Sequence, residues 1–351
     1  MLQVAAVGFN LPRKETHMLA SLLKKSALLA TALTIALNLG SAQAAEKTSL
    51  IVAEPLHGIG YLPLYVAIRK GYFDEQNIDL KVMTVEGGSA HTNAVLTGQA
   101  FAFIGGPEHN AFAKAKGGQL LAVVNVVDRG NVYLVAKKGL APAGTDYASF
   151  LKGKIIATSA YGGTPNSITR FLIDKWKLDM KKDLTVLETT NAGILAAVKT
   201  GQAQIGITSE PALTQGIRQG IWEDTFYNVP KELGPYAYST LNVRKESVEK
   251  TPELVRGFVT AVSKGLKATY ANPAEAAEIA RKEFPTMALE DLKATLDRSF
   301  ADQLWSPDGM ISEAAWNTGK AVVMDAGILK QDVPYADIID MRFLTPKTTT
   351  N

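Results

Sequence analysis

The sequence predicts an α/β protein made of two similar lobes, and three observations support this fold class. Short apolar segments typical of buried strands alternate with segments typical of helices. The alternation restarts near residue 154. The run Ala94–Ala100 returns as Ala197–Ala203 with six of seven residues identical, and in both places a strand precedes it and a proline follows. A repeat of this kind indicates two copies of one structural unit.

The first 44 residues are predicted to be a secretory signal peptide and not part of the fold. Lys24 and Lys25 precede an apolar run over 26–39, and the small residues of 40–44 match a signal-peptidase site. Cleavage is expected after Ala44, and Met18 is expected to be the true start. The alternative is a membrane anchor, but the apolar run is shorter than the roughly 20 residues that span a bilayer.

Net charge and cysteine content limit the classes of function that the sequence supports. The leader holds four of the 37 basic residues and one of the 34 acidic residues, which leaves 33 of each sign in the mature chain. A neutral mature chain gives no reason to expect binding to nucleic acid or to an anionic membrane surface. The chain has no cysteine, so neither a disulfide nor a lipid-modified cysteine is expected. A free periplasmic protein agrees with both.

The first half is predicted to contain strands and helices in turn. Pro63 suits a helix start, while Gly71 and Gly98 suit helix ends. The predicted strands are 49–53, 79–85, 101–104, 120–127 and 131–137, and the predicted helices are 63–71 and 90–96. This order favours a mostly parallel sheet.

The second half repeats the order and then becomes helical. The predicted strands are 154–158, 184–188 and 205–207, and the predicted helices are 165–176, 192–199, 252–270, 273–284, 289–299 and 312–326. Thr251 and Pro252 form a typical helix start, with Thr251 as the cap and Pro252 as the first helical residue.

The element "helix, Lys-Gly-Tyr-Phe, then strand" at 62–80 is a fairly specific pattern, and it occurs together with the weaker stretches Thr97–Ala100, Leu151–Lys154, 327–329, 333–334 and Asp340. With these stretches the sequence resembles a known family, the periplasmic binding proteins for nitrate, taurine, alkanesulfonates and thiamine-precursor pyrimidines.

The resemblance implies a type II periplasmic binding protein fold, in which the chain crosses twice between lobes that close over a ligand. We place the crossings near 137–141 and 236–242. Lobe one is expected to hold 46–138 and 243–345, and lobe two 139–242. The resemblance also implies the substrate-binding component of an ABC importer, with an inner-membrane permease as partner, no cofactor and no oligomer.

The ligand is expected beyond the carboxyl ends of the strands, where open α/β sheets bind ligands. There Ser89 and Asn191 open two helices, one in each lobe, and the free N–H groups of such ends bind anions or dipoles. Ordinary capping by these two side chains is the alternative. The predicted ligand-binding residues are His57, Gly88, Ser89, Glu108, Tyr161, Thr190, Asn191 and Glu210.

Ligand class and alternative functions stay open at this point. Glu54, Glu108 and Glu210 would suit an amine or aminopyrimidine better than a bare oxyanion. His57, His91 and His109 fall in cleft loops but lack the spacing of a preformed metal site, so no metal is expected. Motifs of serine, cysteine and zinc hydrolases are missing, so the protein is predicted not to be an enzyme. A pyrimidine-forming enzyme of the same fold and a partner of a signalling receptor are the alternatives.

Overall fold

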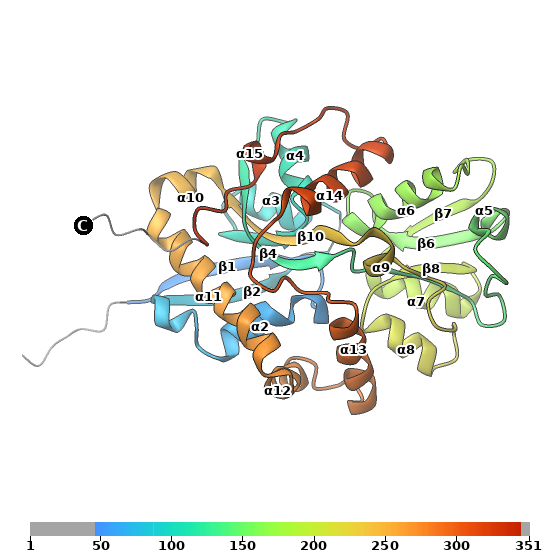
Figure 1. The fold of residues 1–351 in the computed structure, drawn as a ribbon, viewed down its shortest axis with the longest axis horizontal. Coiled ribbons are helices and arrows are strands. Elements are labelled where there is room, and N and C mark those ends of the chain that lie inside the picture. The colour runs from blue at the N-terminus through green and yellow to red at the C-terminus, as the bar shows by residue number, and fades with distance from the viewer. Residues whose placement is uncertain (1–45, 87, 345–351) are drawn as a thin grey trace, which may run out of the picture. The chain divides into compact units, whose positions relative to one another are not determined.

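The computed structural model describes residues 46–86 and 88–344. From Lys47 onward the chain belongs to one compact unit. The predicted signal peptide lies outside the described residues. Within this unit two five-stranded sheets, each with its own helices, form the two lobes that the fold-class prediction called for (Figure 1).

The first sheet has the strand order β2-β1-β3-β10-β4. Its strands are β1 (Thr48–Glu54), β2 (Ile78–Thr84), β3 (Ala102–Gly105), β4 (Leu120–Arg129) and β10 (Pro235–Arg244). β1 pairs in parallel with β2 and β3, whereas β10 runs antiparallel to both β3 and β4. The sheet is therefore mixed, and the expectation of a mostly parallel sheet holds only for its β2-β1-β3 half.

The second sheet repeats this arrangement in the order β7-β6-β8-β5-β9. Its strands are β5 (Tyr133–Ala136), β6 (Ile155–Ser159), β7 (Thr185–Thr189), β8 (Ile205–Thr208) and β9 (Tyr227–Asn228). Here β6 is parallel to β7 and β8, and β5 is antiparallel to β8 and β9. The fourth strand in the order of each sheet, β10 in the first and β5 in the second, is thus the strand that has crossed from the other half of the chain.

Sheet membership corrects the predicted crossings. The chain leaves the first sheet after Arg129 and enters the second at Tyr133, and it returns between Asn228 and Pro235. Both exchanges come earlier than 137–141 and 236–242. The reason is that β5 pairs with β8 and β9, and β10 pairs with β3 and β4, whereas an apolar run in the sequence does not reveal which sheet it joins. The assignment of residue ranges to the lobes stays a proposal.

The repeated run has the same backbone structure in both lobes. It ends α3 (Ala90–Leu96) in the first and α7 (Asn191–Thr200) in the second. Gly98 and Gly201 both have φ of +80°, in the left-handed region. The N–H of Ala100 donates to the carbonyl of Ala94 at 2.9 Å, and that of Ala203 to Ala197 at 3.1 Å. Glycine is required here because the helix must reverse directly into a strand.

Helices cover both sheets, and the predicted long helices are found within three residues of their expected ends. In addition to α3 and α7 they are α2 (Leu62–Arg69), α4 (Glu108–Lys114), α5 (Tyr147–Leu151), α6 (Thr164–Lys175), α8 (Ala212–Arg218), α9 (Val229–Leu233), α10 (Lys245–Lys250), α11 (Pro252–Ala271), α12 (Pro273–Glu283), α13 (Leu289–Ala301), α14 (Glu313–Asp325) and α15 (Tyr335–Ile338), with short 3-10 turns at Ile59–Tyr61 and Asp74–Gln76.

Close helix packing fixes the core of the first lobe. A Cβ at Gly265 of α11 would lie 2.3 Å from the carbonyl oxygen of Pro63 in α2, so only glycine permits this approach.

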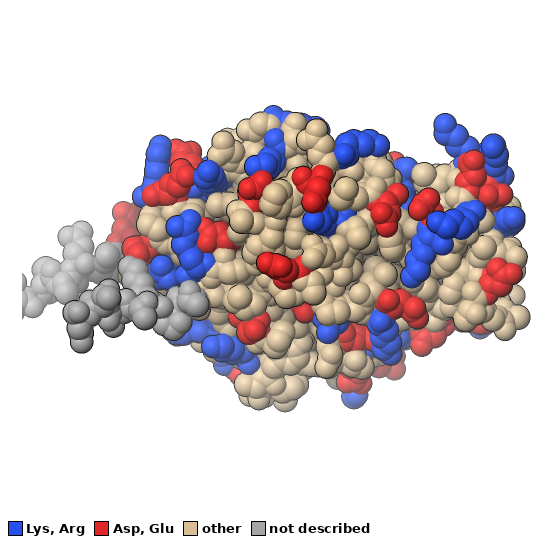
Figure 2. Space-filling model, turned by 45° about the horizontal axis from the view of Figure 1, so that its top comes forward, with Lys and Arg blue, Asp and Glu red and all other residues tan. Residues whose placement is uncertain are grey.

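Figure 2 shows basic and acidic side chains interspersed over the face in view, as a neutral mature chain would predict. Within the described residues, no helix is both long enough and apolar enough to cross a membrane.

Candidate functional site: a cavity between the two lobes

A cavity of about 360 Å³ lies between the lobes and is lined by residues of both. Its walls come from the carboxyl ends of strands: Pro55 and Leu56 follow β1, Gly105 ends β3, and Ser159 ends β6. Ligands of open α/β sheets bind at this edge. The position of the cavity therefore agrees with the positional rule by which the site was predicted.

Among the described residues, those that line the cavity include acidic residues but no lysine or arginine. Glu86 lies two residues after β2, and Glu188 is the next-to-last residue of β7, the equivalent strand of the second lobe. Glu188 accepts hydrogen bonds from Arg170 at 2.9 Å and from Asn166 at 3.1 Å. No hydrogen bond or ion pair involving Glu86 occurs within the part of the chain that the structure describes. A free carboxylate thus faces the cavity from the first lobe.

Two buried histidines form part of the wall. The His91 and His109 rings meet edge to face with centroids 4.7 Å apart. Nδ1 of His109 lies 3.2 Å from the Thr92 hydroxyl, whereas neither ring nitrogen of His91 has a hydrogen-bond partner among the described residues. Burial lowers the pKa of His109 to about 4 and, together with the neighbouring His109, lowers the pKa of His91 well below its ordinary value. Both imidazoles are therefore neutral near pH 7.

The predicted residues Gly88, Ser89 and Tyr161 meet where the lobes touch at the edge of the cavity. A Cβ at Gly88 would lie 2.1 Å from the carbonyl oxygen of Tyr161, and one at Gly162 would lie 3.3 Å from the Ser89 hydroxyl. Of these residues only Gly88 lines the cavity. Tyr161 is 55% exposed, and the guanidinium carbon of Arg170 lies 4.9 Å from the centroid of its ring.

The capping assignment at the two facing helices needs one correction. Thr190, not Asn191, is the N-cap of α7, and its hydroxyl accepts a hydrogen bond from the N–H of Gly193 at 3.1 Å. Asn191 is the first helical residue. Ser89 holds the N-cap position of α3, but its side chain makes no capping bond to any residue that the structure describes. Thr190 and Asn191 line the cavity, so the second lobe contributes the predicted helix end.

Glu108 connects the lobes directly. Its Oε1 accepts a 2.6 Å hydrogen bond from the hydroxyl of Thr164, the first residue of α6 and a lining residue of the cavity. Glu108 is fully buried, and its Oε2 has no partner in the described structure. Burial raises the pKa of Glu108 to about 7.

His57 and Glu210 lie apart from this group. They line a second cavity of about 230 Å³, which shares Leu56, Pro165 and Asn191 with the first. His57 Nδ1 lies 3.0 Å from Glu54, and its ring packs against Tyr65 and Phe284. The hydrogen bond to Glu54 raises the pKa of His57.

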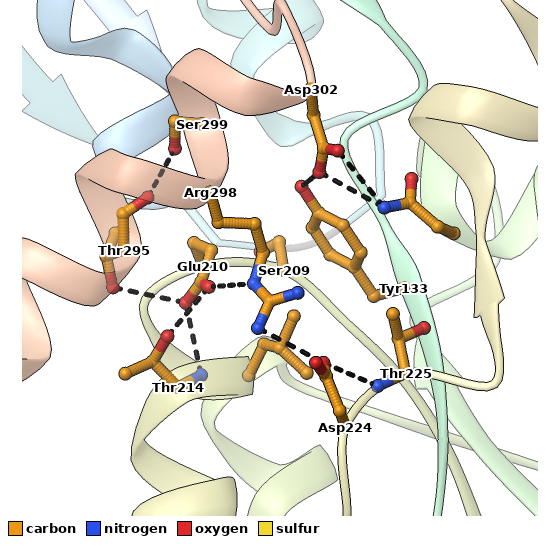
Figure 3. A network of polar contacts seen from close by, with 12 residues as sticks. Tyr133, Ser209, Glu210, Thr214, Asp224, Thr225, Thr295, Arg298, Ser299 and Asp302 are labelled. Carbon is orange, nitrogen blue, oxygen red and sulfur yellow. Dashed lines mark hydrogen bonds and ion pairs between the residues drawn. The ribbon is translucent and has the colours of Figure 1, made fainter.

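The Glu210 carboxylate is hydrogen-bonded to neighbouring protein groups (Figure 3). It accepts hydrogen bonds from the hydroxyl and N–H of Thr214, from Thr295, and at 3.1 Å from Arg298. Arg298 also pairs with Asp224 at 3.1 Å. Arg298 and Thr295 belong to α13, which returns to the second lobe late in the chain. Glu210 therefore fastens α13 to that lobe, and its role in ligand binding stays a prediction.

The predicted ligand-binding residues leave out several polar groups at the cavity, among them Glu86, His91, Ser159, Thr164 and Glu188. His91 was noted as a cleft histidine but not chosen. The positional rule pointed to the loop after β6, yet it gave no reason to prefer Ser159 over its neighbours. Within residues 46–86 and 88–344, no cluster of three or more potential metal ligands occurs, and the expectation of no metal stays a prediction.

Comparison with known proteins decides the family. The family model described as NMT1/THI5 like matches residues 59–276, which is more than half of the chain. The chain belongs to the NMT1/THI5-like family. The match covers most strands of both sheets and every lining residue of the cavity except Pro55 and Leu56. The resemblance drawn from the sequence is thereby confirmed at the level of family and fold.

Individual relatives agree with this placement. The Bacillus subtilis (strain 168) protein named "Putative binding protein YtlA" is 24% identical over 297 residues, which is 84% of this chain and 88% of that protein. The alkanesulfonate-binding protein SsuA from Xanthomonas axonopodis pv. citri, solved with MOPS, has a TM-score of 0.69 at 17% identity, covering 85% of this chain and all of that one.

A third similar structure is the periplasmic nitrate-binding protein NrtA from Synechocystis PCC 6803. Its TM-score is 0.60 at 16% identity, and the match covers 72% of this chain and 70% of that chain. At such identities these structures establish the shared two-lobe fold, and what they bind is a property of those proteins.

Proposed function

We propose that this member of the NMT1/THI5-like family is the exported ligand-binding component of an ABC importer. It captures a small polar or heterocyclic solute between hinged lobes and delivers it to an inner-membrane permease. The observation that carries the proposal is the cavity of about 360 Å³ at the strand ends, which both lobes line. Similar proteins are named as binding proteins, and two of them bind alkanesulfonate or nitrate.

The cavity chemistry supports capture by hydrogen bonds. Ser159, Thr190 and Asn191 offer polar groups from the second lobe, and His91 offers a neutral imidazole from the first. The aromatic residues Tyr61 and Tyr238 give a wall suited to a planar ring. This pattern of mainly apolar walls with a few placed polar groups is typical of small-molecule sites. We propose binding without chemical conversion.

Charge favours one ligand class among those considered, which were sulfonates, taurine, nitrate and thiamine-precursor pyrimidines. A bare oxyanion would lie near the carboxylate of Glu86, which has no partner in the described structure, whereas Glu188 is already paired with Arg170. A ligand with an amine or a heterocyclic N–H can donate a hydrogen bond to the Glu86 carboxylate instead. The proposal therefore leans towards an amine-bearing or heterocyclic solute.

A melting-temperature screen of the mature protein tests the proposal. The compounds are nitrate, ethanesulfonate, taurine, cytosine and 4-aminopyrimidine, each with the protein at pH 7. A ligand at 100 times its Kd should stabilise the fold by about 2.7 kcal/mol. A rise with cytosine or 4-aminopyrimidine, and none with nitrate, is expected. No rise with any compound contradicts the proposed ligand classes, and chemical conversion of a bound compound contradicts a pure binding role.

Export forms part of the proposal, with the mature chain starting at Ala45 and acting as a monomer. N-terminal sequencing of the protein released from the periplasm measures the cleavage point. Recovery of a chain that still contains Leu39 would contradict the signal-peptide assignment.

A further inference from the structure

We propose that His91 and Ser159 grip the same edge of the ligand from opposite lobes, and that they select an edge with both a hydrogen-bond donor and an acceptor. The inference rests on the proposed binding function and names residues for its specificity. It starts from two side chains that are buried, polar and without a partner at the wall of one cavity.

His91 is held in place but not satisfied. It is the second residue of α3 and is 2% exposed, and its ring meets Phe103 edge to face at 5.2 Å and His109 at 4.7 Å. These ring contacts fix the imidazole, yet both of its nitrogens lack a hydrogen bond. Buried polar groups in native proteins nearly always have partners, so two orphan nitrogens on one cavity-lining ring require an explanation.

Gly105 packs closely against Nε2 of His91 in the cavity wall. A Cβ placed on Gly105 would lie 2.7 Å from that nitrogen, and Gly105 itself lines the cavity. The glycine thus keeps this part of the wall free of a side chain.

Ser159 provides the matching group on the other lobe. It ends β6, is 8% exposed, and lines the same cavity, and its hydroxyl has no partner in the described structure. A hydroxyl both donates and accepts, and a neutral imidazole donates at one nitrogen and accepts at the other. The pair is therefore complementary to an uncharged edge with both hydrogen-bond functions, as in an amide or an amino-substituted ring, and a nitrate or sulfonate can only accept.

Isothermal titration with cytosine and 4-aminopyrimidine tests the inference. It measures the ligand affinity of three variants: His91→Leu, Ser159→Ala and the double variant. Each single change should lower the affinity for the binding compound by roughly 10-fold or more, because the ligand group is left unpaired on closure. Thr92→Val is the matched control, because it removes a hydroxyl from α3 that bonds His109 outside the proposed pair. It should leave the affinity within about twofold.

Stability without ligand separates a binding role from a structural one. Replacing an unpartnered buried imidazole by leucine should leave the apo melting temperature unchanged or higher. His91→Gln, which keeps polar atoms, serves if the leucine variant does not fold, and it should lose less affinity. A large drop in apo stability with unchanged affinity would overturn the inference.

The outcomes also separate the inference from the proposed function. The wild type could instead bind nitrate or ethanesulfonate, with the same affinity in His91→Leu. This result would agree with the binding function, but it would overturn the inference that the pair selects a donor–acceptor edge. Failure of all five compounds on the wild type would contradict both. Loss of cytosine or 4-aminopyrimidine binding in both single variants, with apo stability retained, supports the pair.

Discussion

The hydroxyl of Thr164 in the second lobe donates a 2.6 Å hydrogen bond to the buried carboxyl group of Glu108 in the first. The two residues are the first residues of α6 and α4, and this bond joins the lobes beside the cavity. A carboxyl group with one unpartnered oxygen at such a place is costly to ionise. Its protonation is therefore coupled to the packing of the lobes against each other.

Glu108→Gln should flatten the pH dependence of stability. The pKa of Glu108 is raised from 4.5 to about 7, so the folded state binds its proton more tightly than the unfolded state does. Stability should therefore fall as the pH rises from about 4.5 to about 7, by roughly 3 kcal/mol in total. The glutamine variant lacks this loss and should be more stable than wild type at pH 8 but equal at pH 4.

Urea unfolding at pH 4, 6 and 8 measures this difference. The exposed Glu249→Gln is the control, and its effect on stability should be small and similar at all three pH values. Parallel pH curves for wild type and Glu108→Gln would contradict the assignment of a raised pKa to this residue.

Gly88→Ala should weaken ligand binding by preventing the lobes from meeting. The added Cβ would lie 2.1 Å from the Tyr161 carbonyl oxygen, and a backbone atom cannot rotate away as a side chain can. We expect at least a tenfold loss of affinity in isothermal titration, about 1.4 kcal/mol. Gly144→Ala is the matched control, since a Cβ there meets nothing within 4 Å. Equal affinities for the two variants would contradict lobe contact at Gly88 in the bound state.

Thr190→Ala and Ser89→Ala should differ in their effect on apo stability. The Thr190 hydroxyl caps α7 through Gly193, so its loss should cost about 1 kcal/mol. The Ser89 side chain makes no such bond, so its loss should change apo stability by less than about 0.5 kcal/mol. Chemical denaturation without ligand gives both values. A clear loss of apo stability in Ser89→Ala would mean that this residue caps α3 in solution.

Arg298→Met should destabilise the protein strongly. Glu210 is 1% exposed, and removing Arg298 leaves its carboxylate without the ion pair that joins α13 to the second lobe (Figure 3). Breaking a buried pair from one side costs about 3–5 kcal/mol, and the partial exposure of Arg298 puts the expectation at the lower end. Lys293→Met on the same helix breaks an exposed pair with Asp297 and should cost under about 0.5 kcal/mol. Similar losses in both variants would contradict a special role for Glu210 and Arg298.

Periodicity and repeats in the sequence predict most of the fold, because they reflect local rules. The run that contains Gly98 or Gly201 has to stop a helix and start a strand in both lobes, so its structure could be predicted from seven residues. The sheet that β5 or β10 joins depends on pairing between distant segments, and an apolar run carries no record of its partner. The predicted crossings were wrong for that reason.

The sequence predicts a site residue correctly where its position at a strand end decides whether it lines the cavity. The prediction falls short where the direction of the side chain decides this. Gly88, Thr190 and Asn191 follow strand ends and line the cavity. Glu210 also follows a strand end, but its side chain turns to Arg298 and Thr214. His91 became a candidate only when the structure showed that its buried ring lacks partners, which no sequence pattern records.

The most direct test of the central claim is titration calorimetry of the mature protein with the compound that raises its melting temperature most, followed by mass measurement of the released compound. Ala160→Trp fills the cavity that Ala160 lines, and Ala143→Trp changes an exposed alanine away from it. We predict one site per chain, an unchanged ligand mass, binding abolished in Ala160→Trp and binding retained in Ala143→Trp. Binding that survives in Ala160→Trp, or a ligand of altered mass, would contradict capture in the cavity between the lobes.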